Sequence, residues 1–116
     1  MKKFLVMFCD PNDTIQDWLK NTSEEERAKQ TQQMMTDWQA WVEAHKANIV
    51  EGRDLPVGKT KRVTSAGVAD ARNELNYVMV VQAETHDEAA AMFVGHPHLV
   101  IPNSYIDISD SSRPTM

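Results

Sequence analysis

The apolar positions of the chain follow two kinds of period. Residues 4–9 (FLVMFC) and 77–83 (YVMVVQA) are nearly continuous apolar runs, and their short length and their Phe and Val content favour buried β-strands. Residues 60–66 (TKRVTSA) and 104–109 (SYIDIS) alternate between apolar and polar positions, which also indicates strands. The sequence therefore predicts four strands.

A helical period separates the first two of these strands. Apolar and aromatic residues recur there at steps of three and four, which places them on one face of a long helix over about residues 23–47. Thr22 or Ser23 is suited to cap it, ahead of three glutamates that oppose the helix dipole. Residues 14–20 are expected to form a short helical turn before it. The apolar face comprises Met34, Trp38, Trp41, Val42, His45 and Ile49.

A second helix is predicted directly after the strand at residues 77–83. Thr85 begins the segment THDE, in which Glu88 stands at the third helical position, as in a capping box. The helix is expected to stop at Gly95, before the turn His96-Pro97-His98. The segment EGRDLPVGK (51–59), which contains two glycines and a proline, is predicted to be a loop.

The predicted order is strand, long helix, strand, strand, helix, strand. Two such split β-α-β units form an α+β, ferredoxin-like βαββαβ fold, in which a four-stranded antiparallel sheet carries both helices on one face. The length of 116 residues suits one core. We therefore expect a single domain over residues 1–116, with a polar tail at about 109–116.

The strands at residues 4–9 and 77–81 are apolar at both alternating positions. Two helices cover only one face of the sheet, and monomers rarely leave a large apolar face open to water. The usual solution in this architecture is a second copy packed sheet against sheet. The pattern therefore predicts a homodimer.

Charge and cysteine content narrow the possible partners and compartment. The net charge is −5, from 17 acidic and 12 basic residues, which argues against a broad nucleic-acid footprint. With Cys9 as its one cysteine, the chain cannot form an internal disulfide, which fits a reducing compartment. The first apolar run is too short for a signal peptide or a membrane span. We expect a cytoplasmic protein with no membrane partner.

Several segments together resemble the YCII-related family, also called the DGPF-domain family, of dimeric α+β barrel proteins. MKKFLVMF is similar to the family's first strand, and RVTSAGVADARNELNYVMVVQA to its DGPF stretch and the core strand that follows. AETHDEAAAMFVGHPHL resembles its second helix and turn, and IPNSYIDI its last strand. The name-giving motif itself differs, because Ser65, Ala66, Gly67 and Val68 stand in place of Asp-Gly-Pro-Phe.

The resemblance implies the ferredoxin-like fold and the dimer, and a function more loosely. Some members resemble dehydrochlorinases or muconolactone-isomerase-like enzymes. In these, a histidine on the first helix and an aspartate in the turn after the second helix form an acid–base dyad. By position, the corresponding residues here are Asp37 and His96, so the resemblance implies a dyad with its members exchanged between the two elements.

The two histidines of the HPH turn have different expected roles. Pro97 holds His96 extended, so the two rings leave the backbone in different directions and form a poor metal site. We expect no metal and no cofactor. His98 is expected to pack in the turn or to line a ligand site. His96 is the candidate acid–base residue, and a bond to Asp37 would raise its pKa.

Other candidates concern ligand binding. Trp38, Trp41 and His45 share the apolar face of the long helix, where they would form core or line a pocket. In the segment GKTKR (58–62), Arg62 could grip a carboxylate with two hydrogen bonds. A solvated basic edge strand that blocks aggregation explains the same residues equally well.

Two classes of function remain open from the sequence, so whether the protein is an enzyme is undecided. One is a small-molecule lyase or isomerase that uses a His–Asp proton-transfer pair in a cleft between the sheet and the long helix. The other is a non-catalytic homodimer that binds a small organic acid or aromatic ligand in a Trp-lined pocket. The most general description is a YCII-related protein of unknown function.

Overall fold

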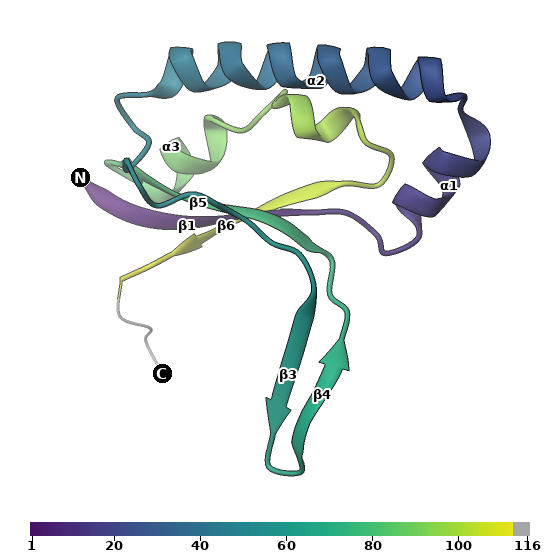
Figure 1. The fold of residues 1–116 in the computed structure, drawn as a ribbon. Coiled ribbons are helices and arrows are strands. Elements are labelled where there is room, and N and C mark those ends of the chain that lie inside the picture. The colour runs from purple at the N-terminus through teal and green to yellow at the C-terminus, as the bar shows by residue number, and fades with distance from the viewer. Residues whose placement is uncertain (113–116) are drawn as a thin grey trace.

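A computed structural model describes residues 1–112 of the chain. Figure 1 shows a layer of helices above a sheet and a hairpin that projects from the other side of the sheet. In chain order the elements are β1 (Lys2–Cys9), α1 (Thr14–Asn21), α2 (Glu24–His45), β2 (Leu55–Pro56), β3 (Thr60–Thr64), β4 (Gly67–Ala71), β5 (Leu75–Ala83), α3 (His86–Ala91), the 3₁₀ helix η1 (Pro97–Val100) and β6 (Tyr105–Asp110).

The main sheet has four strands in the order β2-β5-β1-β6, and every neighbouring pair is antiparallel. The helices lie on one face of this sheet (Figure 1). The α+β, ferredoxin-like prediction is therefore confirmed. The long runs at β1 and β5 pair along their whole length, which places the most apolar strands at the centre of the sheet.

The predicted strand at residues 60–66 is not part of this sheet. Instead β3 pairs only with β4, in a separate two-stranded sheet. The edge of the main sheet is taken by β2, which pairs Leu55 with Val78 and Pro56 with Tyr77. A proline is tolerated at an edge because no neighbour needs its missing N–H. The alternating pattern at residues 60–64 therefore predicted a strand correctly, but this strand pairs with the next one in the chain, β4, and not with the main sheet.

The helix starts follow the capping residues. The Ser23 hydroxyl accepts a hydrogen bond from the backbone N–H of Glu26 at 3.1 Å, and the Thr85 hydroxyl accepts one from Glu88 at 3.1 Å. Both satisfy amides that the first helical turn would otherwise leave free. The long helix ends at His45, two residues before the predicted end.

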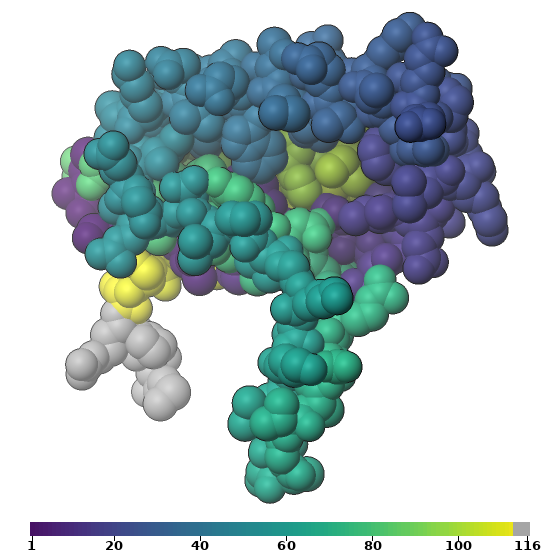
Figure 2. Space-filling model, in the orientation of Figure 1, coloured from purple at the N-terminus to yellow at the C-terminus, as the bar shows by residue number. Residues whose placement is uncertain are grey.

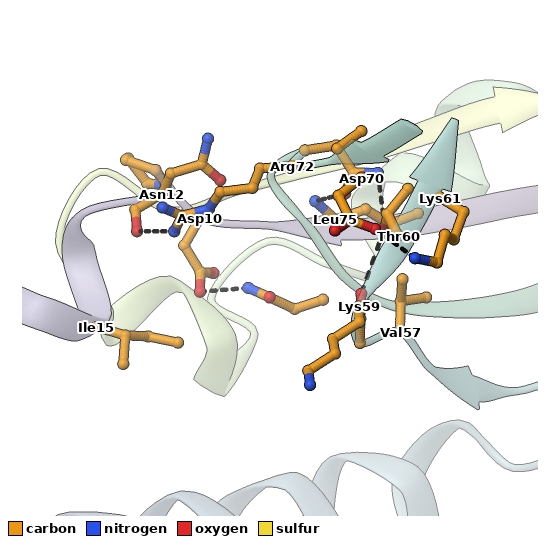
Figure 3. Close-up of a pocket in the computed structure, with 15 residues that line it drawn as sticks. Asp10, Asn12, Ile15, Val57, Lys59, Thr60, Lys61, Asp70, Arg72 and Leu75 are labelled. Atoms are coloured by element: carbon orange, nitrogen blue, oxygen red, sulfur yellow. Dashed lines mark hydrogen bonds and ion pairs between the residues drawn. The ribbon is translucent and has the colours of Figure 1, made fainter. Parts of the chain in front are cut away.

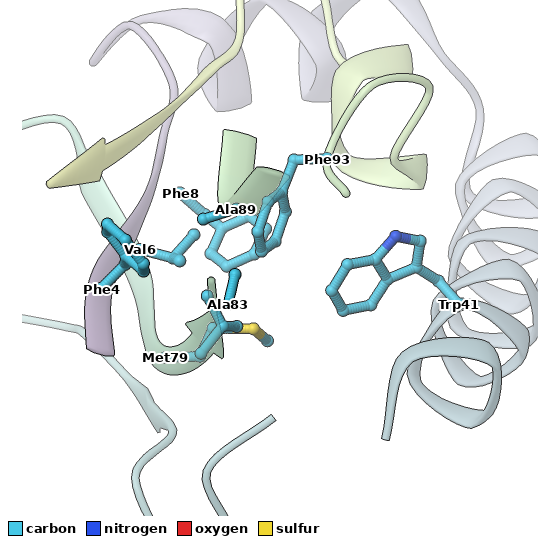
Figure 4. Close-up of a cluster of buried hydrophobic side chains, with 9 residues drawn as sticks. Phe4, Val6, Phe8, Trp41, Met79, Ala83, Ala89 and Phe93 are labelled. Atoms are coloured by element: carbon cyan, nitrogen blue, oxygen red, sulfur yellow. The ribbon is translucent and has the colours of Figure 1, made fainter. Parts of the chain in front are cut away.

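The hydrophobic core lies between the helices and the central strands. Phe4, Val6 and Phe8 on β1 are fully buried, as the alternation of side chains along a strand requires. Figure 4 shows Trp41 of α2 and Phe93, from the turn after α3, reaching toward this row. The remaining members of the cluster are Met79, Val81, Ala83 and Ala89.

The opposite face of the sheet carries the alternate residues. Leu5 and Met7 of β1 lie there beside Val80 and Val78 of β5, which are their register partners. None of these four is fully buried, and Leu5 is 37% exposed. The helix-free face defined by these residues is therefore apolar and open to solvent in a single chain.

The last strand runs to Asp110, so the predicted polar tail begins later than residue 109, and residues 113–116 lie outside the described part. Within residues 1–112, no helix combines the length and apolar character that crossing a membrane requires.

Replacing Phe8 with alanine should destabilise the fold strongly, because a fully buried ring would leave a cavity under α2. We expect a loss of about 3–5 kcal/mol in the free energy of unfolding, measured by urea denaturation. Val94→Ala is the matched control, since Val94 is 83% exposed and should change stability by less than about 0.5 kcal/mol. Equal effects of the two variants would contradict this core.

Candidate functional site

His96 lies inside an aromatic cage rather than in a cleft. Its side chain is 1% exposed, and its ring centroid lies 4.6 Å from those of Trp38 and Trp41 and 5.1 Å from that of Phe8. Nδ1 accepts a hydrogen bond from the backbone N–H of His98 at 3.0 Å. His96 thus caps the 3₁₀ helix η1.

The cage keeps His96 neutral. Burial, and to a smaller extent the nearby His98 and His45, together lower its pKa from 6.5 to about 4. Because Nδ1 accepts a bond, the proton of the neutral ring belongs on Nε2, which has no hydrogen-bond partner among the described residues. The surrounding indole rings are the groups available to receive this N–H as a weak bond. The expected rise in the pKa of His96 is wrong.

Asp37 does not meet His96 through any hydrogen bond or ion pair within residues 1–112. Its side chain is exposed on α2, where Oδ1 accepts a bond from Nε2 of Gln33 at 2.9 Å, one turn earlier. Helical periodicity put Asp37 at the edge of the apolar face, and at that edge the side chain turns to solvent. The pair implied by the resemblance is therefore not formed.

A different His–Asp pair does form at the same turn. Nε2 of His98 lies 3.0 Å from the carbonyl oxygen of Cys9 and 3.4 Å from Oδ1 of Asp10. The carbonyl oxygen is an acceptor only, so Nε2 carries a proton that is directed to the end of β1. Both side chains are 6% exposed. The turn after α3 is thereby fastened to the strand end.

Asp10 is a buried carboxyl group with an unusual environment. Burial raises its pKa above the ordinary 3.8, while His98 and a hydrogen bond from Asn76 oppose the rise. Asn76 donates that bond to Oδ2, but Oδ1 has no hydrogen-bond partner among the described residues. A buried carboxyl group with a raised pKa is suited to accept and return a proton.

Asp10 also lines a groove of about 560 Å³ between the end of β1 and the base of the β3–β4 hairpin. Figure 3 shows Asp10 on one side of this groove and Lys59 and Thr60 on the other. The rest of the lining is mixed. Its polar and charged residues are Asn12, Lys61, Asp70, Arg72, Asn73 and Asn76, and its other residues are Pro11, Ile15, Val57, Gly58, Ala71 and Leu75.

The cations of the groove differ in how they are held. Lys61 forms an ion pair with Asp70 across the hairpin at 2.5 Å, and Arg72 donates to the carbonyl oxygen of Asn12 at 3.1 Å. Lys59 has no hydrogen-bond or ion-pair partner in the described part of the chain. Arg62 does not line the groove. In the segment GKTKR (58–62), Lys59 and Lys61 therefore line this groove, whereas Arg62 does not.

The predicted Trp-lined pocket is filled by packing. Trp41 is buried, and its indole N–H donates to the carbonyl oxygen of Met92 at 3.1 Å. His45 stacks on Trp41 with ring centroids 4.4 Å apart, and Trp38 packs on Phe8 at 5.0 Å. Trp41 belongs to the buried core and Trp38 packs against it, and none of the three lines the groove at Asp10.

Sequence reasoning missed Asp10, Asn76 and Arg72. Asp10 follows the apolar run of β1 directly, and no role was predicted for it. A carboxylate at the end of a buried strand was the available signal. Arg72 lies in the segment after β4, a strand that the sequence did not reveal. Within residues 1–112, no three histidine, cysteine or acidic side chains are arranged to hold a metal ion.

Comparison with known proteins supports the fold through similarity to a solved structure. No protein-family model matches the chain, and no curated protein matches it significantly. A solved structure of 5-chloro-2-hydroxyhydroquinone dehydrochlorinase (TftG) from Burkholderia phenoliruptrix AC1100, in complex with 2,5-dihydroxybenzoquinone, is similar at a TM-score of 0.54 and 15% identity. The similarity covers 97% of this chain and 95% of that one. It supports the α+β, ferredoxin-like fold, while membership of the YCII-related family stays a prediction.

Acid should destabilise the fold through His96. Its folded pKa of about 4 lies below the unfolded value of about 6.5, so this stabilisation is complete above pH 6.5 and is lost as the pH falls toward 4. Between pH 7.5 and pH 5 the expected loss is on the order of 2 kcal/mol. Urea denaturation at both pH values measures it.

His96→Asn isolates this contribution, because asparagine can still cap the turn but does not titrate. At pH 7.5 the variant should have a lower free energy of unfolding than the natural protein, because it leaves a cavity. On acidification to pH 5, however, its free energy of unfolding should fall by about 2 kcal/mol less than that of the natural protein. The same loss in both proteins would show that His96 is not the titrating group.

Proposed function

We propose that the chain is a small-molecule enzyme of the lyase or isomerase type, which moves a proton on a small organic anion bound in the groove at Asp10. One observation carries the proposal: a buried carboxyl group with a raised pKa faces a groove lined by cationic side chains. Asp10 takes the role of the proton-transfer group, and His98 positions it. This pair replaces the expected pair of Asp37 and His96.

The proposed chemistry needs only one proton and no cofactor. The Asp10 carboxylate takes a proton from a carbon next to a carbonyl group, and the electron pair moves onto the carbonyl oxygen. In an isomerisation the proton returns to another carbon. In an elimination the electrons expel an anion from the neighbouring carbon, and Asp10 later releases the proton to water. A raised pKa makes the carboxylate a stronger base.

The cations suit an anionic substrate. Lys59 is free of ion-pair partners in the described structure, and Arg72 keeps unused donors beyond its bond to Asn12. Such donors stabilise both a substrate carboxylate and the enolate oxygen that forms when the proton leaves. The neighbouring dehydrochlorinase structure contains a dihydroxybenzoquinone, a compound with acidic hydroxyls. This likeness supports the class of ligand.

Removing the cations and removing the base should have separable effects. We expect 2,5-dihydroxybenzoquinone to bind the natural protein in calorimetric titration, and Lys59→Gln with Arg72→Gln to weaken binding at least tenfold. Asp10→Asn should leave affinity within about threefold but reduce proton exchange at least a hundredfold. Exchange is followed as deuterium incorporation from D₂O into a panel of small keto acids by NMR.

Lys29→Gln is the control for charge, because Lys29 is exposed on α2 and away from the groove lining. Binding that is unaffected by the Lys59 and Arg72 changes would exclude the groove. Binding without exchange of any compound would favour the non-catalytic class, a small-ligand-binding homodimer with no chemistry.

We also propose that the chain forms a homodimer through the helix-free face of its sheet. Leu5, Met7, Val78 and Val80 form a continuous apolar row there across the two central strands. Burying such a row in a second copy removes it from water at about 25 cal/mol per Å² of apolar surface. This face has no helix of its own chain to cover it (Figure 1).

A charge in the middle of this face should dissociate the dimer. Leu5→Glu would bury a carboxylate between two sheets, so we expect the dissociation constant to rise at least a hundredfold in analytical ultracentrifugation. Leu19→Glu on α1, at a residue that is 52% exposed, should leave it unchanged. A natural protein that sediments as a monomer at micromolar concentration would contradict the proposal.

A further inference from the structure

The β3–β4 hairpin stands away from the rest of the molecule without support from its own chain. Every residue from 61 to 70 is exposed, and Figure 2 shows the hairpin as a finger that leaves the body. The radius of gyration is 16.1 Å, compared with about 13 Å for a compact domain of this length. A two-stranded ribbon alone is marginally stable in water.

The far part of the hairpin carries an apolar pair. Val63 and Val68 face each other in the register of the two strands, and they are 75% and 67% exposed. The loop beyond them closes through Gly67, whose φ of 124° favours glycine over other residues. The hairpin therefore ends in a defined turn, and its two valines are exposed to solvent.

The hairpin also differs in charge from the rest of the chain. Residues 59–71 contain three basic residues and one acidic residue, a net charge of +2, whereas the whole chain carries −5. Lys61 is neutralised by Asp70, but Arg62 has no ion-pair or hydrogen-bond partner in the described part of the chain. A basic finger on an acidic protein is complementary to the body of another copy.

The direction of the hairpin decides which surface it can reach. It extends from the sheet on the side opposite to the helices (Figure 1), which is the side of the apolar row at Leu5, Met7, Val78 and Val80. A second copy stacked on that row would lie beside the hairpin. One partner can therefore cover both exposed apolar surfaces, and two-fold symmetry supplies two such contacts.

We propose that the β3–β4 hairpin is an arm that clasps a second copy of this chain, with Val63 and Val68 packed on the partner and Arg62 bound to its acidic surface. The inference rests on the proposed homodimer and assigns to it a second contact. It also gives Arg62 a role as an interface residue. Because Lys61, Asp70 and Thr60 at the base of the arm line the groove, docking of the arm would fix one wall of the site.

The test replaces the apolar pair and follows assembly. Val63→Ser with Val68→Ser should raise the dimer dissociation constant at least tenfold in analytical ultracentrifugation, and Arg62→Glu should raise it further. The control is Val94→Ser with Val100→Ser, because these valines are similarly exposed, at 83% and 73%, but belong to the helix side. Circular dichroism checks that each variant is folded.

Hydrogen exchange on the natural protein gives an independent readout. Amides of residues 60–71 should exchange quickly at concentrations where the chain is monomeric, and at least tenfold more slowly where it is dimeric. A dimer that is weakened by Leu5→Glu but unaffected by the hairpin variants, with unchanged exchange at 60–71, would overturn the arm and leave the dimer standing. A monomeric natural protein would overturn both.

Discussion

The packing of Phe8 against the turn His96-Pro97-His98 joins the helix layer to the end of β1, where the groove lies. Phe8 is fully buried on the central strand, and its ring contacts those of His96 and His98 with centroids 5.1 and 5.5 Å apart. Cys9 at the end of β1 and Asp10 directly after it both lie beside Nε2 of His98. The end of β1 thus contacts the helix layer above it and also borders the groove.

His96 and His98 have different roles in the turn. His96 is enclosed by rings that exclude water, so it remains neutral and supports the turn through a backbone bond. His98 lies beside a carboxyl group, so its proton is directed to the strand end. Burial alone would drive the pKa of Asp10 upward, and the contact with His98 limits that rise. The turn therefore moderates the pKa of a carboxyl group that lines the groove.

The groove and the hairpin share residues, which links the proposed chemistry to the proposed assembly. Lys61 and Asp70 pair across the hairpin and line the groove at its base. In the proposed dimer, a partner that holds the arm would also support this wall of the groove. Both proposals therefore depend on the β3–β4 hairpin.

The sequence by itself determined the α+β fold, the capping of both main helices and the apolar core, because these depend on local periods and on residues close in the chain. It also drew attention to the turn His96-Pro97-His98. Only the tertiary structure decided which aspartate meets that turn, since Asp10 and His98 are far apart in sequence and their approach depends on strand pairing. Likewise, the pattern at residues 60–64 indicated a strand but not its partner. Alternation fixes the faces of a strand, whereas its neighbour is chosen by turn geometry and by competition for the edge of the sheet.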